Sequence, residues 1–90
     1  MNAIPSLLES AQTRTLANVL LDLAEQKRLG DECIMRWDRA YAAGDRDEEE
    51  RQSDIGAAID DRISDLEAEA KGMILAATGV SWDRLYEALA

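Results

Sequence analysis

The stretch that decides the fold runs from residue 44 to residue 79 and reads GDRDEEERQSDIGAAIDDRISDLEAEAKGMILAATG. It opens on Gly44 and Asp45, a pair typical of a turn, because glycine suits the left-handed end of one helix and aspartate caps the next. Glu48 follows three residues after Asp45 and completes a capping-box pattern. The stretch closes on Gly79, a second glycine suited to a helix end. We therefore predict one long helix over residues 46–78.

Apolar residues within this helix recur at steps of three and four. They are Ile55, Ile59, Ile63, Leu66, Ala70, Met73 and Ala77. Such spacing places all seven on one face of a helix, where they are available for packing. A second long helix is therefore expected to lie against this face.

The sequence upstream of the turn shows the same helical period. Pro5 and Ser6, with Glu9 three residues after Ser6, form another capping-box pattern and predict a helix start at Ser6. The apolar face that follows consists of Leu16, Leu20, Leu23, Ile34, Trp37 and Tyr41. We expect this face to pack against the helix downstream of the turn.

Gly30 and Asp31 stand in the middle of this upstream pattern. Together they weaken a helix interior by about 1 kcal/mol or more. The apolar pattern keeps its phase across them, so one kinked helix is an alternative to two separate ones. We favour a kink or break, with helices over residues 6–29 and 31–43.

A five-residue motif, WDRxY, occurs twice and contains every aromatic residue of the chain. The copies are at residues 37–41 and 82–86, and Ser81 is placed to cap a short last helix over residues 81–89. Residues four apart share a helix face, so each copy presents a Trp/Tyr pair. These pairs either fill the ends of the core or serve as exposed anchors for another protein, for which the C-terminal copy is better placed. The candidate anchors are Trp37, Tyr41, Trp82, Arg84 and Tyr86.

These elements predict a single all-α domain over residues 1–90. Its expected architecture is a long antiparallel helical hairpin with a short C-terminal helix. Because two helices bury only one stripe each, we expect the hairpin to dimerise into a helical bundle.

The formal charge of −9 and the absence of histidine limit the classes of function. No basic stripe exists to displace counterions, which disfavours direct binding to nucleic acid or to an anionic membrane. The single Cys33 cannot form an internal disulfide and is typical of a small buried residue in a reducing compartment. We expect a cytoplasmic protein.

Acidic residues are concentrated in one part of the chain, with eleven Asp or Glu against three Arg between residues 45 and 69. Five of them share the side of the long helix opposite the Ile/Leu face, namely Asp47, Glu50, Asp54, Asp61 and Asp65. We call these five residues the acidic stripe. It is interpreted either as the solvated side of an amphipathic helix or as a surface that binds a basic groove of another protein.

Catalytic and metal sites are poorly supported. Without histidine there is no Ser-His or Cys-His pair, and one cysteine cannot build a zinc site. Asp22 with Glu25, and Asp61 with Asp65, are carboxylate pairs to consider for Mg²⁺ in a helical bundle, but the paired glutamate motifs of all-α nucleotide pyrophosphatases are absent. We therefore expect no enzyme, no metal and no cofactor.

Three functional hypotheses follow. The first is a non-catalytic protein-binding module, an adaptor or inhibitor, that acts through its helical faces and Trp/Tyr anchors. The second is an acidic inhibitor that imitates nucleic acid and occupies the basic groove of a DNA- or RNA-handling enzyme, encoded by a phage or another mobile element. The third is a structural coiled-coil element. The expected partners are another protein with a basic groove and a second copy of the chain.

Overall fold

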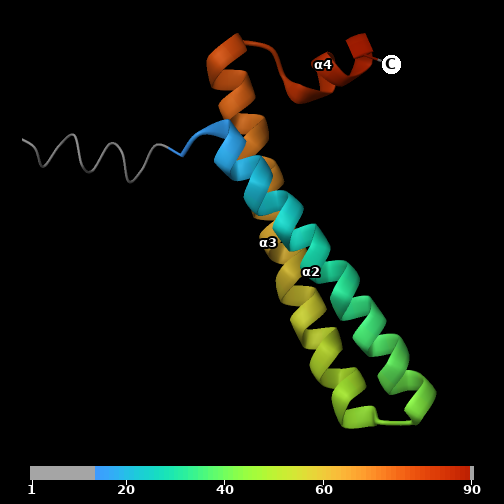
Figure 1. Ribbon diagram of the computed structural model, residues 1–90. Coiled ribbons are helices and arrows are strands. Elements are labelled where there is room, and N and C mark those ends of the chain that lie inside the picture. The colour runs from blue at the N-terminus through green and yellow to red at the C-terminus, as the bar shows by residue number, and fades with distance from the viewer. Residues whose placement is uncertain (1–13, 90) are drawn as a thin grey trace, which may run out of the picture.

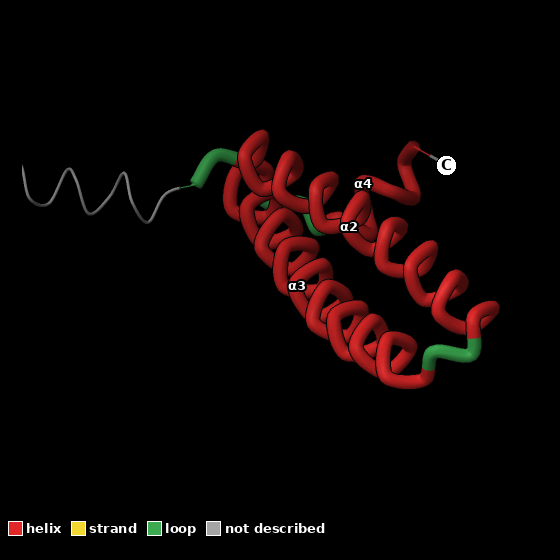
Figure 2. Tube along the Cα trace, turned by 60° about the horizontal axis from the view of Figure 1, so that its bottom comes forward, coloured by secondary structure: helices red, strands yellow, loops and turns green. Residues whose placement is uncertain are grey.

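The computed structural model describes residues 14–89, which form three helices and no strand (Figure 1). The first two are long: α2 spans Leu16–Ala43 and α3 spans Arg46–Thr78, and the short α4 spans Trp82–Leu89. Figures 1 and 2 show α2 and α3 side by side in opposite directions, with α4 turning away from the far end of α3. The predicted all-α hairpin with a short C-terminal helix is confirmed. No helix in this described part has the length and apolarity needed to cross a membrane.

The turn between α2 and α3 has the predicted caps. Gly44 is left-handed at φ 70°, and its N–H donates to the Tyr41 carbonyl at 3.1 Å. The Asp45 side chain accepts from the Glu48 N–H at 3.2 Å. Glu48 does not return this hydrogen bond, because the Asp45 N–H donates to the Ala40 carbonyl instead. Half of the predicted capping box is therefore formed, and α3 has the predicted bounds.

The structure differs from the predicted break in the middle of α2, and it describes the helix from Leu16. Thr15 caps the helix, with its side-chain oxygen accepting from the Asn18 N–H at 3.1 Å, and the expected start at Ser6 lies outside the described residues. The helix also continues through Gly30 without a break. Gly30 faces α3, where a Cβ would lie 3.6 Å from Ile59, so helix pairing continues across this position. Tertiary packing of this kind outweighs a weak local helix propensity.

The contact between α2 and α3 follows a seven-residue repeat, with alternating steps of three and four that are typical of an antiparallel coiled coil. We call this line of contact the seam. Its α2 positions are all buried or half-buried: Leu16, Val19, Leu23, Gln26, Gly30, Cys33, Trp37 and Ala40. Its α3 positions are likewise buried or half-buried: Gln52, Gly56, Ile59, Ile63, Leu66, Ala70 and Met73.

The seam selects small residues where the α2 sequence offers a choice between neighbours. It takes Val19, Cys33 and Ala40, each of which is followed by a larger apolar residue. Those larger neighbours, Leu20, Ile34 and Tyr41, are 47%, 61% and 65% exposed. They had been assigned to the packed face from the sequence, and this assignment was wrong. Ile55 and Ala77 of the predicted α3 face are exposed as well, whereas its other five members lie in the seam.

The core is small and lies toward the open end of the hairpin. Val19, Leu66 and Ala70 form a buried cluster, and Leu16, Leu23 and Met73 pack around it. Among the described residues, Val19 and Leu66 are the only large side chains that are fully buried. Stability of the isolated hairpin therefore depends on a few contacts.

We expect Leu66→Ala to destabilise the hairpin by about 2–5 kcal/mol, because a fully buried leucine leaves a cavity when truncated. Leu75→Ala is the matched control, since Leu75 lies on the same helix and is 49% exposed. The control is expected to cost less than about 1 kcal/mol. Urea denaturation followed by circular dichroism measures both. Equal losses would contradict the placement of the seam.

Candidate functional site

One face of the hairpin carries three hollows in a row, from the open end to the turn. The open-end hollow has a volume of about 270 Å³ and includes Leu20, Leu23, Ile74 and Trp82 in its lining. The middle hollow is lined by residues that include Gly30, Ile34, Gly56 and Ile63. The turn-end hollow is bordered by Trp37, Tyr41, Glu49 and Glu50. Because Lys27 lines both the open-end and the middle hollows, they adjoin along α2. We call this face the groove.

The large apolar residues that follow seam residues on α2 line this groove. Leu20 borders the open-end hollow, Ile34 the middle one and Tyr41 the turn-end one. In the heptad they occupy the position just after a seam residue, on the side facing the groove. Gly30 and Gly56, which have no side chains, contribute to the lining of the middle hollow. The groove is therefore a row of three hollows along the two helices, mainly apolar in its open-end and middle hollows and more polar at the turn end.

The two WDRxY motifs are not equivalent in the structure. Trp37 is half-buried in the seam, and its ring stacks on that of Tyr41 with centroids 5.3 Å apart and planes 14° apart. Trp82, Arg84 and Tyr86 lie on α4 and are exposed. α4 packs against α3 only, although the Trp82 side chain reaches the open-end hollow. The motifs thus place one tryptophan near each end of the groove.

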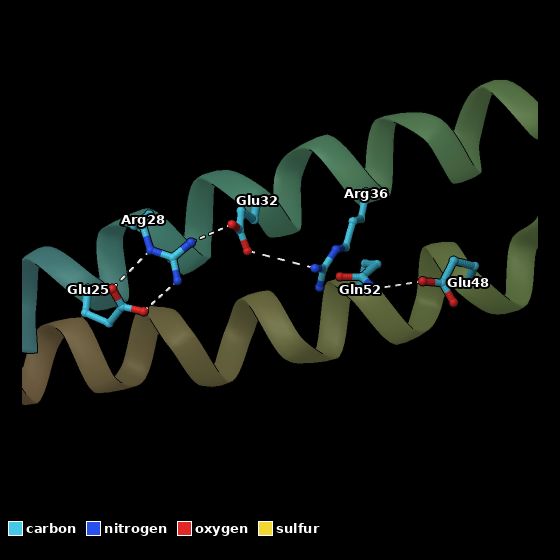
Figure 3. Close-up of polar contacts among 6 residues, drawn as sticks. All are labelled: Glu25, Arg28, Glu32, Arg36, Glu48 and Gln52. Atoms are coloured by element: carbon cyan, nitrogen blue, oxygen red, sulfur yellow. Dashed lines mark hydrogen bonds and ion pairs between the residues drawn. The ribbon is translucent and has the colours of Figure 1, made fainter.

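The opposite face of the hairpin is polar and rich in ion pairs. Arg28 pairs with Glu25 and with Glu32, and Glu32 also contacts Arg36 at 3.9 Å (Figure 3). Arg14 pairs with Asp22 and, across the helices, with Glu69 at 3.3 Å. None of the ion pairs found among residues 14–89 involves a residue that lines the groove. The two faces therefore differ in chemistry.

Hydrogen bonds shift the titration of two glutamates. The Arg28 guanidinium donates to Glu25 and holds the pKa of that carboxyl below its usual range. Glu48 accepts from Gln52 Nε2 at 2.8 Å and from Arg51, and both contacts lower the pKa of Glu48. Figure 3 shows Glu48 and Gln52 together on α3. These exposed contacts order the polar face and the start of α3.

The acidic stripe lies on the outer side of α3, away from the seam. All five of its side chains are exposed, and none takes part in an ion pair among the described residues. Glu50 also borders the turn-end hollow, so the stripe meets the groove near the turn. The stripe is thus a second surface that is available for contact.

The acidic residues and Cys33 were also considered as metal ligands or as a nucleophile. No group of three or more His, Cys, Asp or Glu within residues 14–89 is arranged to hold a metal. Asp22 and Glu25, considered from the sequence for Mg²⁺, face Arg14 and Arg28. The buried thiol of Cys33 donates to the Gln52 carbonyl, with sulfur and oxygen 2.9 Å apart. Its burial and this contact fit a packing residue better than a nucleophile.

Sequence reasoning missed the groove and its two lysines. Lys27 and Lys71 are the only lysines of the chain, and both line the open-end hollow. A signal was present, because Leu20, Ile34 and Tyr41 fall on one heptad position together with Lys27. The sequence alone does not distinguish this position from the adjacent one, which holds Val19, Cys33 and Ala40, because both are apolar.

Comparison with protein-family models, with curated proteins and with solved structures finds no match for this chain. Functional inference therefore depends on the groove, the acidic stripe and the aromatic side chains themselves.

Glu48→Gln is expected to reduce the dependence of stability on acid pH. The folded pKa of Glu48 lies below its ordinary value of 4.5, so its contribution is present above that value and is lost as pH falls through the folded pKa. At neutral pH the variant should be less stable than the parent, and the two should converge as Glu48 becomes protonated. Urea denaturation across the acid range measures this. A constant difference in the free energy of unfolding would contradict it.

Proposed function

We propose that the chain is a non-catalytic protein-binding module, an adaptor or inhibitor, whose groove receives a helix of its partner. The observation that carries this proposal is the sorting of neighbouring residues on α2. The seam takes the smaller of each pair, and the larger one lines the groove. Burying one such side chain stabilises a complex by about 1.5–3 kcal/mol before the costs of association. A row of them along one face is typical of a binding surface.

The shape and composition of the groove support a helical partner. Two antiparallel helices with apolar side chains between them form a cradle into which a third helix can lay its apolar face. Trp37, Tyr41 and Trp82 lie at its two ends, and tryptophan and tyrosine dominate binding hot spots. No residue that lines the groove takes part in an ion pair among the described residues. A partner helix that enters the groove would therefore not have to break an ion pair there. We further propose that this binding occurs in the cytoplasm, which fits the buried free thiol of Cys33.

Site-specific photo-crosslinking in cells of the source organism tests this function. A photoreactive benzoylphenylalanine is placed at Ile34, in the groove, or at Met35, the next residue. These side chains are matched in exposure, at 61% and 55%, and Met35 lines none of the three hollows. We expect a discrete protein adduct from position 34 and none from position 35. Adducts of equal yield, or none from position 34, would contradict a groove that binds protein.

A second candidate function rests on the acidic stripe. Its five carboxylates are exposed on one side of α3, spaced along a rigid helix and without ion-pair partners among the described residues. We propose, as the alternative, that this row imitates a phosphate backbone and occupies the basic groove of a DNA- or RNA-handling enzyme, as an inhibitor carried by a phage or another mobile element. The mutual repulsion of these charges motivates this proposal, because a solvated face does not require it.

The triple variant Asp54→Asn, Asp61→Asn, Asp65→Asn tests the alternative. It should abolish competition with DNA for nucleases and DNA-binding proteins of the source organism, and the parent's competition should weaken steeply with salt. The matched control removes three exposed charges elsewhere, by Asp38→Asn, Asp83→Asn and Glu87→Gln. If both triple variants compete as the parent does, or if both lose competition equally, the stripe is not the determinant.

A further inference from the structure

The described residues bury few large apolar side chains and leave many exposed. Only Val19 and Leu66 are fully buried, whereas ten large apolar or aromatic side chains are exposed. Four of these ten, Leu20, Ile34, Tyr41 and Trp82, line the groove. A unit of this size has little core to spare. We propose that the groove is covered by a second copy of the chain, packed in the reverse direction, so that the open end of each copy meets the turn end of the other. This inference rests on the proposed function and names the partner.

The two ends of the groove complement each other in shape. The open-end hollow has a volume of about 270 Å³ and a lining that includes Leu20, Leu23 and Ile74. The turn end instead presents the stacked pair of Trp37 and Tyr41, whose outer ring is largely exposed. Reversal of the second copy places an aromatic pair over each apolar hollow. The contact between an aromatic pair of one copy and the open-end hollow of the other occurs twice, as the symmetry of an isologous dimer requires.

The two ends also complement each other in charge. Lys27, Lys71 and Glu67 line the open-end hollow, two positive charges against one negative. Glu49, Glu50 and Arg46 line the turn-end hollow, two negative charges against one positive. None of these six side chains takes part in an ion pair among the described residues. The reverse arrangement brings Lys71 to the second copy's glutamates. If both turns lay at the same end, two turn ends that each carry a net negative charge would meet and repel one another.

One twofold axis satisfies these matches together. At 1.5 Å per residue, Lys71 lies about 39 Å from the turn along α3 and Glu49 about 6 Å, so their pairing places the axis about 22 Å from the turn. The same axis brings Leu20, at about 36 Å, close to the level of the second copy's Trp37, at about 10 Å. Gly30 lies at about 21 Å, so the middle hollow coincides with the crossing point.

The centre of this dimer contains charges that must be compensated. Asp31 and Asp60 line the middle hollow and lie close to the proposed axis, where two copies of each would approach. Lys27 lines the same hollow, and the axis carries it toward the second copy's Asp31. The two copies of Lys27 therefore face the carboxylates at the crossing. Lysines beside the acids thus offset the repulsion between the carboxylates of the two copies at the crossing.

Purified full-length chain, with no other protein present, tests the inference by light scattering coupled to gel filtration. The expected mass is twice the chain mass of 10.0 kDa. Lys71→Glu alone, or Glu49→Lys with Glu50→Lys, should weaken the dimer about ten-fold or more at low salt. An equimolar mixture of the two variants should recover dimerisation, because opposite charges then meet at both ends. A chain that is monomeric throughout, or variants without the expected loss and recovery, would overturn the inference.

Crosslinking measures the direction of packing. In a Cys33→Ala background, Asp31→Cys places a thiol near the proposed axis, and Leu20→Cys places one about 27 Å from its own copy. A short bis-maleimide should link the first variant into dimers and leave the second unlinked. Equal linking of both would refute the reverse orientation. A monomeric purified chain whose Ile34 adduct in cells contains a different protein would refute the second copy but leave the protein-binding groove intact.

Discussion

The close approach of α2 and α3 is the constraint on which the rest of the structure depends. Gly30 and Gly56 lie in the seam, and a Cβ on either would contact the facing helix at 3.6 Å or 3.5 Å. Cys33, Ala40 and Ala70 are the buried neighbours that keep the helices near one another. Because interhelical distance is set by the side chains at the contact, the small residues of the seam hold the two helices close where they occur. On α2 the larger neighbours of these small residues, Leu20, Ile34 and Tyr41, lie at the edge of the seam and line the groove.

Much of the fold could be predicted from the sequence because its signals are local. Gly44, Asp45 and Gly79 mark helix ends through backbone geometry and capping, so the bounds of α3 followed directly. Gly30 was misinterpreted because its propensity is local, whereas its packing against Ile59 is not. Thr15 was not predicted as the cap of α2, because it caps through a single hydrogen bond that carries no distinctive motif.

The candidate site was harder to predict than the fold, for a related reason. On α2, Val19 and Leu20, Cys33 and Ile34, and Ala40 and Tyr41 are three adjacent pairs that satisfy the same seven-residue spacing. Hydrophobicity favours the larger member of each pair for the core, and the structure uses the smaller. The choice depends on how closely α3 approaches, which no single helix encodes. The acidic stripe, by contrast, was visible because its charges lie opposite the packed face whichever line forms the seam.

The position of the core cluster bears on how the hairpin is held closed. Val19 and Leu66 meet near the open end, separated by far more chain than Cys33 and Gln52, which meet near the turn with a separation of 19 residues. Loop-closure entropy grows only with the logarithm of length, so the distant pair costs about 0.8 kcal/mol more than the near one. That is less than burial of one leucine contributes. A long hairpin can thus place its most buried contact at the end opposite its turn, because the added cost in loop-closure entropy is small.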